Sequence, residues 1–461
     1  MILKECKMEH KKLRIAVLTA ALTLGTGISA FAAGWVKNST NGQWQYQDNA
    51  GYIVKNEWKK GADDQWRYLN SAGFMAVNSW VDDEYYVNAE GIMVAENWLQ
   101  VSDPYSDNTI WYFFDSKGKA VKDGWKKINE KWYFFDELGV MQVGWVDENR
   151  YYVDENGGML IGWQKLDPPA DVDYSQDYEN DYDPFALADH DGQYWYYFKS
   201  TGKKLTPKED GGENGVVRID NDYYCMNLDG ALQYGWKNVT GESSISAYKY
   251  FLPSGKMVTG WYSAEAPRGL ENSDGDVHWY YFNSRGVPKA AESDDYSTKD
   301  LMNIGGKTYL FGVDGIPLTG LRKIYLDENN ANYTSYYFGK NENECWAHKG
   351  RQQVEEDNGE VSTFYFTDAG RGYTGIKDGY LYFAGKAQKA ENSKYEVINL
   401  PGSNYGVVVN SSGKVMKNTT VKFDDGSKYK TNAAGKVIKI DDQDVDNITG
   451  SDPREPSWYS D

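Results

Sequence analysis

The chain has 461 residues, a formal net charge of −19 and a strongly aromatic composition, with 17 Trp, 38 Tyr and 47 Gly. An acidic surface of this size repels nucleic acid and polyphosphate, so the composition argues against nucleic-acid partners and suits a cationic or neutral ligand. The mean hydropathy of −0.71 indicates that aromatic rings take the place of much of an aliphatic core. With 3 Cys, the chain has no disulfide framework, although one bond between Cys225 and Cys345 is possible.

Residues 1–32 have the features of a secretory signal. Lys11, Lys12 and Arg14 precede an apolar run from 15 to 28, and Ala30-Phe31-Ala32 fits a cleavage site. No later segment is apolar for long enough to span a bilayer. We therefore expect a secreted protein without a membrane span, held at the cell surface or cell wall without covalent attachment.

A repeat of roughly 20 residues extends from Trp35 to about Gly320 and indicates a solenoid of small supersecondary units. Its clearest copy, residues 124–139, begins with Gly-Trp, continues with a polar stretch and a Trp-Tyr-Phe-Phe run, and closes with Gly139. The aromatic run is typical of a β-strand and residues 136–139 of a turn that leads to a second short strand, 140–143. We predict an all-β fold, a repetitive β-hairpin solenoid with acidic loop insertions, in which each hairpin is stabilised by its neighbours.

The copies align on their closing glycine, for which we expect a backbone φ above zero that only glycine adopts easily. These glycines are Gly51, Gly73, Gly91, Gly118, Gly139, Gly157, Gly202, Gly230, Gly255 and Gly286. Seven residues earlier most copies have a second tryptophan, namely Trp44, Trp66, Trp111, Trp132, Trp195 or Trp279. Glu84 and Arg150 stand there in two other copies, which suggests that some units bind a ligand and others are spacers.

The aromatic solenoid is predicted to cover 33–320 and to continue in degenerate form over 321–440. In that continuation Leu321 and Ile376 replace the opening tryptophan, while aromatic strands persist. The polar, acidic segment 441–461 is predicted to be a disordered tail. The acidic insertion 166–193 offers clustered carboxylates for calcium, but without EF-hand spacing we favour a solvated loop and predict no metal site.

Alternation along a strand places Trp132 and Phe134 on one face and Tyr133 and Phe135 on the other. We predict a three-walled aromatic box made of Trp125, Trp132 and, from the next hairpin, Tyr152. Such boxes attract quaternary ammonium groups, because the faces of aromatic rings are negative and the cation is weakly hydrated. The equivalent predicted boxes are Trp35, Trp44 and Tyr68; Trp58, Trp66 and Tyr86; and, as weaker sites, Trp98, Trp111 and Phe134, and Trp236, Tyr248 and Tyr281.

Two further tryptophan pairs, Trp163 with Trp195 and Trp261 with Trp279, meet Cys225 and Leu310 at the third position and are predicted to be poorer sites. The rings have an alternative role, because large aromatic side chains can also serve as the core of a thin solenoid.

These residues resemble the choline-binding or cell-wall-binding repeats of secreted Gram-positive bacterial proteins. The resemblance spans nearly the whole chain after the signal and is strongest over 34–286. It implies a left-handed β-solenoid, and partners such as choline-decorated teichoic acid or, in related branches, glucans and other wall or extracellular glycans. It also implies that Trp125, Trp132 and Tyr152 match the choline pocket.

We expect a non-catalytic binding protein without a cofactor. The repeats begin directly after the predicted signal, and His190, His278 and His348 have neither zinc-site nor triad neighbours in the sequence. Three alternatives stay open: a glucan-binding repeat protein, an adhesin whose partner is a host protein, and the targeting module of a wall hydrolase.

Overall fold

A computed structural model describes residues 32–103, 107–172, 192–210, 215–267, 270, 276–327 and 329–460. The predicted signal segment lies outside these residues except for its last position, and so does most of the acidic insertion 166–193. The chain divides into two compact units, residues 1–162 with 200–203 (unit 1), and residues 163–199 with 204–461 (unit 2).

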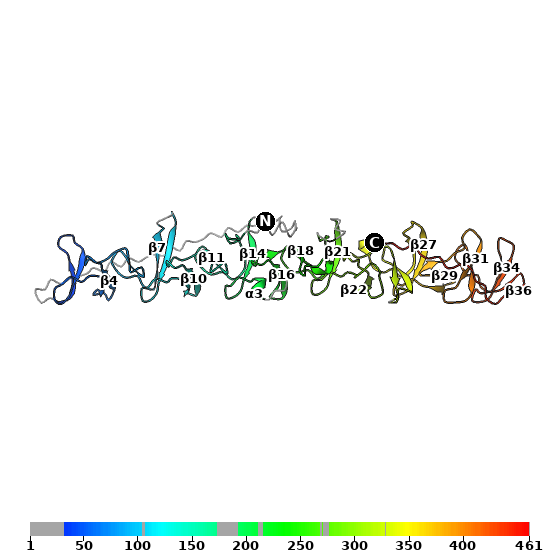
Figure 1. Cartoon of the computed structure of the whole chain (residues 1–461), viewed down its shortest axis with the longest axis horizontal. Helices are drawn as coiled ribbons and strands as arrows, with labels where there is room; N and C mark the ends of the chain where they lie inside the picture. Colours follow the sequence, from blue (N-terminus) through cyan, green and yellow to red (C-terminus); the bar gives the residue numbers. More distant parts are fainter. Residues whose placement is uncertain are drawn as a thin grey trace. The chain divides into compact units, whose positions relative to one another are not determined.

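Unit 1 consists of antiparallel hairpins that follow one another in chain order (Figure 1). Each pairs a Gly-Trp or related strand with the aromatic strand after it. The pairs are β1 (Gly34–Lys37) with β2 (Trp44–Gln47), β3 (Glu57–Lys60) with β4 (Trp66–Leu69), β5 (Ser79–Val81) with β6 (Tyr85–Val87), β7 (Asn97–Ser102) with β8 (Thr109–Phe114), β9 (Gly124–Ile128) with β10 (Lys131–Phe135), and β11 (Gly144–Val146) with β12 (Tyr151–Val153).

Unit 2 continues the hairpins and adds broader sheets. Its hairpins are β13 (Gly162–Leu166) with β14 (Tyr194–Phe198), β18 (Gly235–Asn238) with β19 (Tyr248–Phe251), β20 (Gly260–Glu265) with β21 (Val277–Phe282), β22 (Met302–Ile304) with β23 (Lys307–Tyr309), β24 (Leu321–Tyr325) with β25 (Tyr333–Tyr337), and β31 (Tyr395–Asn399) with β32 (Gly406–Asn410).

Three sheets of unit 2 have more than two strands. A three-stranded sheet has the order β15 (Val216–Ile219), β16 (Asp222–Met226) and β17 (Leu232–Gln233); a five-stranded sheet has the order β26 (Gly350–Glu355), β27 (Val361–Phe366), β30 (Lys386–Ala387), β29 (Tyr380–Phe383) and β28 (Gly375–Lys377); and a four-stranded sheet has the order β33 (Thr420–Lys422), β34 (Lys428–Thr431), β35 (Val437–Ile440) and β36 (Gln443–Asp444).

Helical turns are short: α3 (Pro207–Asp210) and the 3₁₀ turns η1 (Ile245–Ala247) and η2 (Glu342–Glu344). Within the described ranges, no helix has the length and apolar character needed to cross a membrane. The prediction of an all-β, repetitive hairpin fold is confirmed.

The hairpin turn and the glycine turn are separate features. In β9–β10 the tight turn is Asn129-Glu130, both with positive φ, at 46° and 68°. The closing Gly139 (φ 85°) ends a second turn, in which Asp136 Oδ1 accepts the backbone N–H of Leu138 and of Val140. Every closing glycine of the alignment has a φ between 70° and 86°, so this expectation is confirmed. The predicted strand at 140–143, however, pairs only through one bridge, Phe135↔Met141.

The fully buried residue of each hairpin recurs at one position of the repeat, four residues before the closing glycine. Leu69, Val87, Phe114, Phe135, Val153, Phe198 and Phe251 are 0% exposed. The tryptophans do not stand at this position; at the second tryptophan position Trp66, Trp132, Trp195 and Trp279 are exposed, and Trp44 and Trp111 are partly buried. The opening tryptophans Trp98, Trp163, Trp236 and Trp261 nevertheless pack against buried clusters, so the alternative in which aromatic rings serve as core applies in part to them.

The segment expected to be a disordered acidic tail instead packs on unit 2. Gln443 and Asp444 form strand β36, and Ser451 pairs in parallel with Ile398. The rings of Trp458 and Tyr459 pack against a buried cluster that includes Leu321. Two aromatic rings give this otherwise polar segment enough apolar surface to order it.

Candidate functional site

Each opening tryptophan contacts an aromatic ring of its own hairpin. Trp125 and Phe134 are cross-strand partners, with ring centroids 5.1 Å apart at 62°. The same pairing joins Trp98 to Phe113 at 5.1 Å. Cross-strand neighbours on one face of an antiparallel pair come this close by necessity, so the hairpin register alone places an aromatic ring against each of these opening tryptophans.

The second tryptophan lies two residues earlier on the aromatic strand and therefore on the same face. Trp98 and Trp111 have ring centroids 6.3 Å apart at 86°, and Trp261 and Trp279 are 6.5 Å apart at 79°. The ring at this position stays open to solvent: Trp66, Trp132, Trp195 and Trp279 are 39–42% exposed.

A backbone hydrogen bond from the next hairpin holds this second position in place. The carbonyl of Trp111 accepts the N–H of Met141 at 2.8 Å, and that of Trp132 accepts the N–H of Met159 at 3.0 Å. The link recurs at Trp66, whose carbonyl accepts from Met93 at 2.8 Å. The segment after each closing glycine thus connects neighbouring hairpins at the second tryptophan.

The third wall differs from the sequence prediction by one residue. Trp125 is contacted by Tyr151, with ring centroids 5.0 Å apart, whereas the predicted Tyr152 lies 5.2 Å from Trp145 of its own hairpin. The reason is geometric: when hairpins are stacked in the same orientation, one face of each meets the opposite face of the next. Because successive strand residues point to opposite faces, the ring that reaches back is one position earlier.

The same correction applies to the other predicted boxes. Trp58 meets Tyr85 at 5.4 Å rather than Tyr86, Trp98 meets Tyr133 at 5.0 Å rather than Phe134, and Trp236 meets Tyr280 at 5.0 Å rather than Tyr281. A signal for this wall was present in the sequence, because Tyr recurs six residues before the closing glycine at Tyr85, Tyr112, Tyr133, Tyr151, Tyr224 and Tyr280.

The corrected register completes two boxes that were expected to be poor. Trp163 meets Tyr224 at 5.0 Å, and Trp261 meets Tyr309 at 5.0 Å. The predicted third positions at these boxes, Cys225 and Leu310, are buried, at 5% and 0% exposure.

The register also leaves the first box incomplete. The predicted Tyr68 contacts Trp58 instead, at 5.1 Å, and the residue six before Gly73 is Arg67. Arg67, Trp35 and Trp44 line one small cavity of about 10 Å³. Both terminal nitrogens of Arg67 donate to the Asp63 carboxylate, at 2.8 and 2.7 Å.

Four tyrosines at the third-wall position have a raised pKa. Burial raises the pKa of Tyr112, Tyr133 and Tyr224, and the negative charges of Asp136, Asp154 and Asp222, respectively, raise it further. Burial likewise raises the pKa of Tyr309. Nearby carboxylates that disfavour a phenolate also favour a bound cation.

Beyond the tryptophan-rich copies, the opening position is closed. Leu321 is 0% exposed within a cluster that includes Tyr337, and Ile376 packs against a cluster around Leu381. The aliphatic residues there serve as core and leave no ring available to a ligand.

The remaining reactive groups do not assemble a catalytic or metal centre within the described ranges. No group of three or more His, Cys, Asp or Glu side chains in these ranges is arranged to hold a metal ion. His278 Nδ1 lies 2.7 Å from Glu342 Oε1. Cys225 and Cys345 are both buried, and they do not form the disulfide that the sequence allowed.

Unit 2 also contains a larger cavity, of about 430 Å³, which shares Trp195 with one of the boxes. It combines the rings of Trp195, Tyr250 and Tyr262 with polar groups of Lys165 and Glu265. This mixed lining was not foreseen, because it joins residues from hairpins that are separated in the sequence.

Family models of repeats match three parts of the chain. Residues 52–93 and residues 123–163 each match a model described as a choline-binding repeat, and residues 190–204 and 278–287 match a putative cell wall binding repeat. The fold and its ring contacts therefore define a protein built from aromatic hairpin repeats. Those repeats belong to the choline-binding, or cell-wall-binding, repeat family.

Individual relatives are more distant. Glucosyltransferase-S of Streptococcus mutans is 25% identical over 241 residues, which cover 49% of this chain and 15% of that protein. Among solved structures, the modular autolysin LytC of Streptococcus pneumoniae is 20% identical over 65% of this chain and 56% of its own, with a TM-score of 0.38. Choline binding protein F of the same species is 20% identical, covering 70% of this chain and 100% of its own, with a TM-score of 0.36.

Proposed function

We propose that this chain is a secreted, non-catalytic protein of the bacterial cell surface that binds choline of teichoic acid in the aromatic boxes between its hairpins. The observation that carries this proposal is the box of Trp98, Trp111 and Tyr133. The ring centroids of Tyr133 and Trp111 lie 5.0 and 6.3 Å from that of Trp98, and the ring planes are inclined to it by 67° and 86°. The three ring faces therefore form adjacent walls rather than a closed stack. Each ring face contributes roughly 0.5–2 kcal/mol to holding a quaternary ammonium group.

The charge of the protein supports a cationic ligand. The net charge of −19 attracts cations over long distances, and the carboxylates near the tyrosine walls add a local attraction. The residues proposed for binding are those of the corrected boxes: Trp58, Trp66 and Tyr85; Trp98, Trp111 and Tyr133; Trp125, Trp132 and Tyr151; Trp163, Trp195 and Tyr224; Trp236, Tyr248 and Tyr280; and Trp261, Trp279 and Tyr309.

Thermal unfolding of the full chain with increasing choline tests the proposal. A ligand that binds only the folded state raises the melting temperature in a concentration-dependent way. We expect choline to do so and ethanolamine at the same concentration to do much less, because its primary ammonium is strongly hydrated. Combined Trp111→Ala and Trp132→Ala substitutions are expected to reduce the choline effect, while Leu138→Ala, at an exposed turn residue, leaves it unchanged. No choline-dependent shift in the unsubstituted chain would contradict the proposal.

A second candidate function, binding of a glucan or wall glycan, is favoured by the larger cavity in unit 2. Aromatic rings can stack on the apolar face of a sugar while neighbouring polar groups hydrogen-bond its hydroxyls. Trp195 and Tyr262 provide the rings, and Glu265 provides the polar group. The similarity to a glucosyltransferase over 49% of the chain points in the same direction. If glucan oligosaccharides raise the melting temperature while choline does not, the glycan is the better ligand.

The absence of catalysis is part of the proposal and has its own test. Incubation of the full chain with labelled peptidoglycan is expected to release no soluble fragment, whereas any bond cleavage would support a wall hydrolase. A host-protein partner, the adhesin alternative, has no contact in the structure that favours it.

A further inference from the structure

The C-terminal residues 451–460, here called the strap, run back over unit 2 and are fixed by backbone hydrogen bonds. The N–H of Ser451 donates to the carbonyl of Val397 at 3.0 Å, and the carbonyl of Ser451 accepts the N–H of Asn399 at 2.9 Å. At the other end, the N–H of Tyr459 donates to the carbonyl of Leu321 at 2.9 Å. The strap thus connects β31 to β24.

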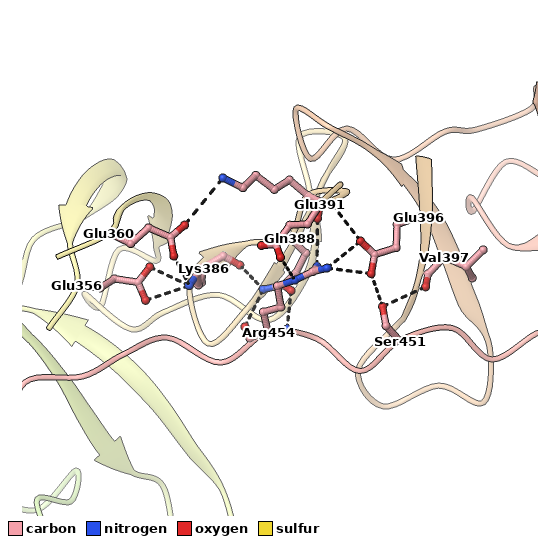
Figure 2. A network of polar contacts seen from close by, with 10 residues as sticks. Glu356, Glu360, Lys386, Gln388, Glu391, Glu396, Val397, Ser451 and Arg454 are labelled. Carbon is pink, nitrogen blue, oxygen red and sulfur yellow. Dashed lines mark hydrogen bonds and ion pairs between the residues drawn. The ribbon is translucent and has the colours of Figure 1, made fainter. Parts of the chain in front are cut away.

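Polar side chains anchor the middle of the strap (Figure 2). Arg454 Nη2 donates to both carboxylate oxygens of Glu396, at 2.9 and 2.8 Å, and its backbone N–H donates to Gln388 Oε1 at 2.8 Å. The N–H of Ser457 donates at 2.7 Å to Glu356, a fully buried carboxylate that is also paired with Lys386 at 2.9 Å. Bidentate and buried contacts of this kind specify one position for the strap.

The strap returns aromatic rings to a hairpin that has lost its own. In β24–β25, Leu321 stands at the opening tryptophan position and pairs with Tyr337. The position two residues before Tyr337, which holds the second tryptophan in other copies, is Ser335, and it is 0% exposed. Trp458 Nε1 donates to Ser335 Oγ at 2.8 Å. The indole of the strap therefore lies at the position from which the repeat's own tryptophan is missing.

A cation of the chain lies among these rings. The Nζ atom of Lys323 is 4.2 Å from the ring centroid of Tyr333, 5.1 Å from that of Trp458 and 5.2 Å from that of Tyr325. All three distances are within the range of cation–π attraction. Tyr325 and Tyr333 are cross-strand partners, and the Tyr333 hydroxyl is hydrogen-bonded to Glu455 of the strap.

We propose that hairpin β24–β25 and the strap form an aromatic cage for an alkylammonium group, and that its resident ligand is the chain's own Lys323. The cage is closed to external ammonium ligands as long as Lys323 is present. Removing that side chain opens a new site for a small primary alkylammonium ion. The proposal is independent of whether the N-terminal boxes bind choline.

Hydrogen exchange of the full chain, measured by mass spectrometry on a peptide that contains 457–460, tests the cage. Lys323→Ala removes a three-carbon chain and the ammonium group, which propylammonium replaces. We expect this substitution to reduce the protection of the strap amides about fivefold, the loss of roughly 1 kcal/mol of cation–π attraction. Propylammonium is expected to restore protection in a saturable way, and propan-1-ol, its uncharged analogue, is not.

Two further variants separate the charge from simple packing. Lys323→Met keeps the length of the side chain but not the charge, and is expected to lose strap protection as Lys323→Ala does. Lys422→Met, at an exposed lysine of β33, is the matched control and is expected to leave the strap unchanged. Wild-type protection in Lys323→Met, or failure of propylammonium to rescue Lys323→Ala, would overturn the proposal. Unchanged exchange over 216–226, which lies in unit 2 away from the strap, verifies that this unit remains folded in the variants.

Discussion

Replacing Tyr151 by Ala tests the corrected register of the boxes against the register expected from the sequence. Tyr151 provides one of the rings around Trp125, at a centroid distance of 5.0 Å. Its loss removes roughly 1 kcal/mol of cation–π attraction, which corresponds to about fivefold weaker choline binding at this box. Tyr152→Ala is the matched control, because that neighbouring ring points to the opposite face and packs on Trp145 at 5.2 Å.

The assay must report on one box among several. Incorporation of 5-fluorotryptophan gives a ¹⁹F resonance for Trp132, which a Trp132→Phe variant identifies. Its shift during a choline titration then yields the dissociation constant of the Trp125 box alone. If Tyr152→Ala weakens binding at Trp132 while Tyr151→Ala does not, the register derived from the ring contacts is refuted.

Three further predictions concern stability and reactivity. Gly157→Ala is expected to destabilise the chain by about 2 kcal/mol or more in denaturant unfolding, because its φ is 78° and the added Cβ would lie 2.4 Å from a methionine sulfur. Gly144→Ala is the control: its φ is 83° but the space around it is open, so it should cost only about 1 kcal/mol. Equal effects of the two substitutions would contradict the packing argument. The hydrogen bonds from Arg67 lower the pKa of Asp63 to about 2 from 3.8, so the stability that this ion pair gives the fold is complete above about pH 4 and is lost as the pH falls towards 2. Asp63→Asn should remove roughly 1 kcal/mol of this pH dependence in acid titrations of unfolding. An unchanged dependence of the unfolding free energy on pH would count against the pair. Burial raises the pKa of Cys345 to about 11, so iodoacetamide at pH 8 should label it only after unfolding, and rapid labelling of the native chain would indicate an accessible thiolate.

The local features of the fold were predictable because they are written within single copies of the repeat. The closing glycine needs a positive φ, the residue three positions before it in the clearest copy, Asp136, caps the turn with its carboxylate, and the aromatic run alternates faces. These requirements involve neighbouring residues only. They were sufficient to predict the hairpins and the first two walls of each box.

The third wall depends on how one hairpin meets the next, which no single copy encodes. Assigning Tyr152 to the Trp125 box assumed that equivalent faces of successive hairpins meet. Stacking in the same orientation requires opposite faces to meet, so the contact falls on Tyr151. The error was systematic, and one geometric rule corrects every box.

The C-terminal segment was misjudged for a different reason. Its composition is polar and acidic, which favours disorder when a segment is considered alone. Its order comes from partners far away in the sequence: Glu396 for Arg454, Glu356 for the amide of Ser457, and Ser335 for the indole of Trp458. Such pairing depends on tertiary structure and leaves no local periodicity to detect.

The distribution of the chain's own cations argues for a division of roles among the boxes. In the first box the third wall is Arg67, which is paired with Asp63, and in β24–β25 Lys323 occupies the ring cluster directly. Between these two positions the third wall is a tyrosine, and burial raises the pKa of Tyr133 and Tyr224. The same attraction between a ring and a cation therefore serves two purposes in one fold. Where the chain supplies the cation it stabilises the protein, and where only tyrosine closes the box the site is left for a ligand.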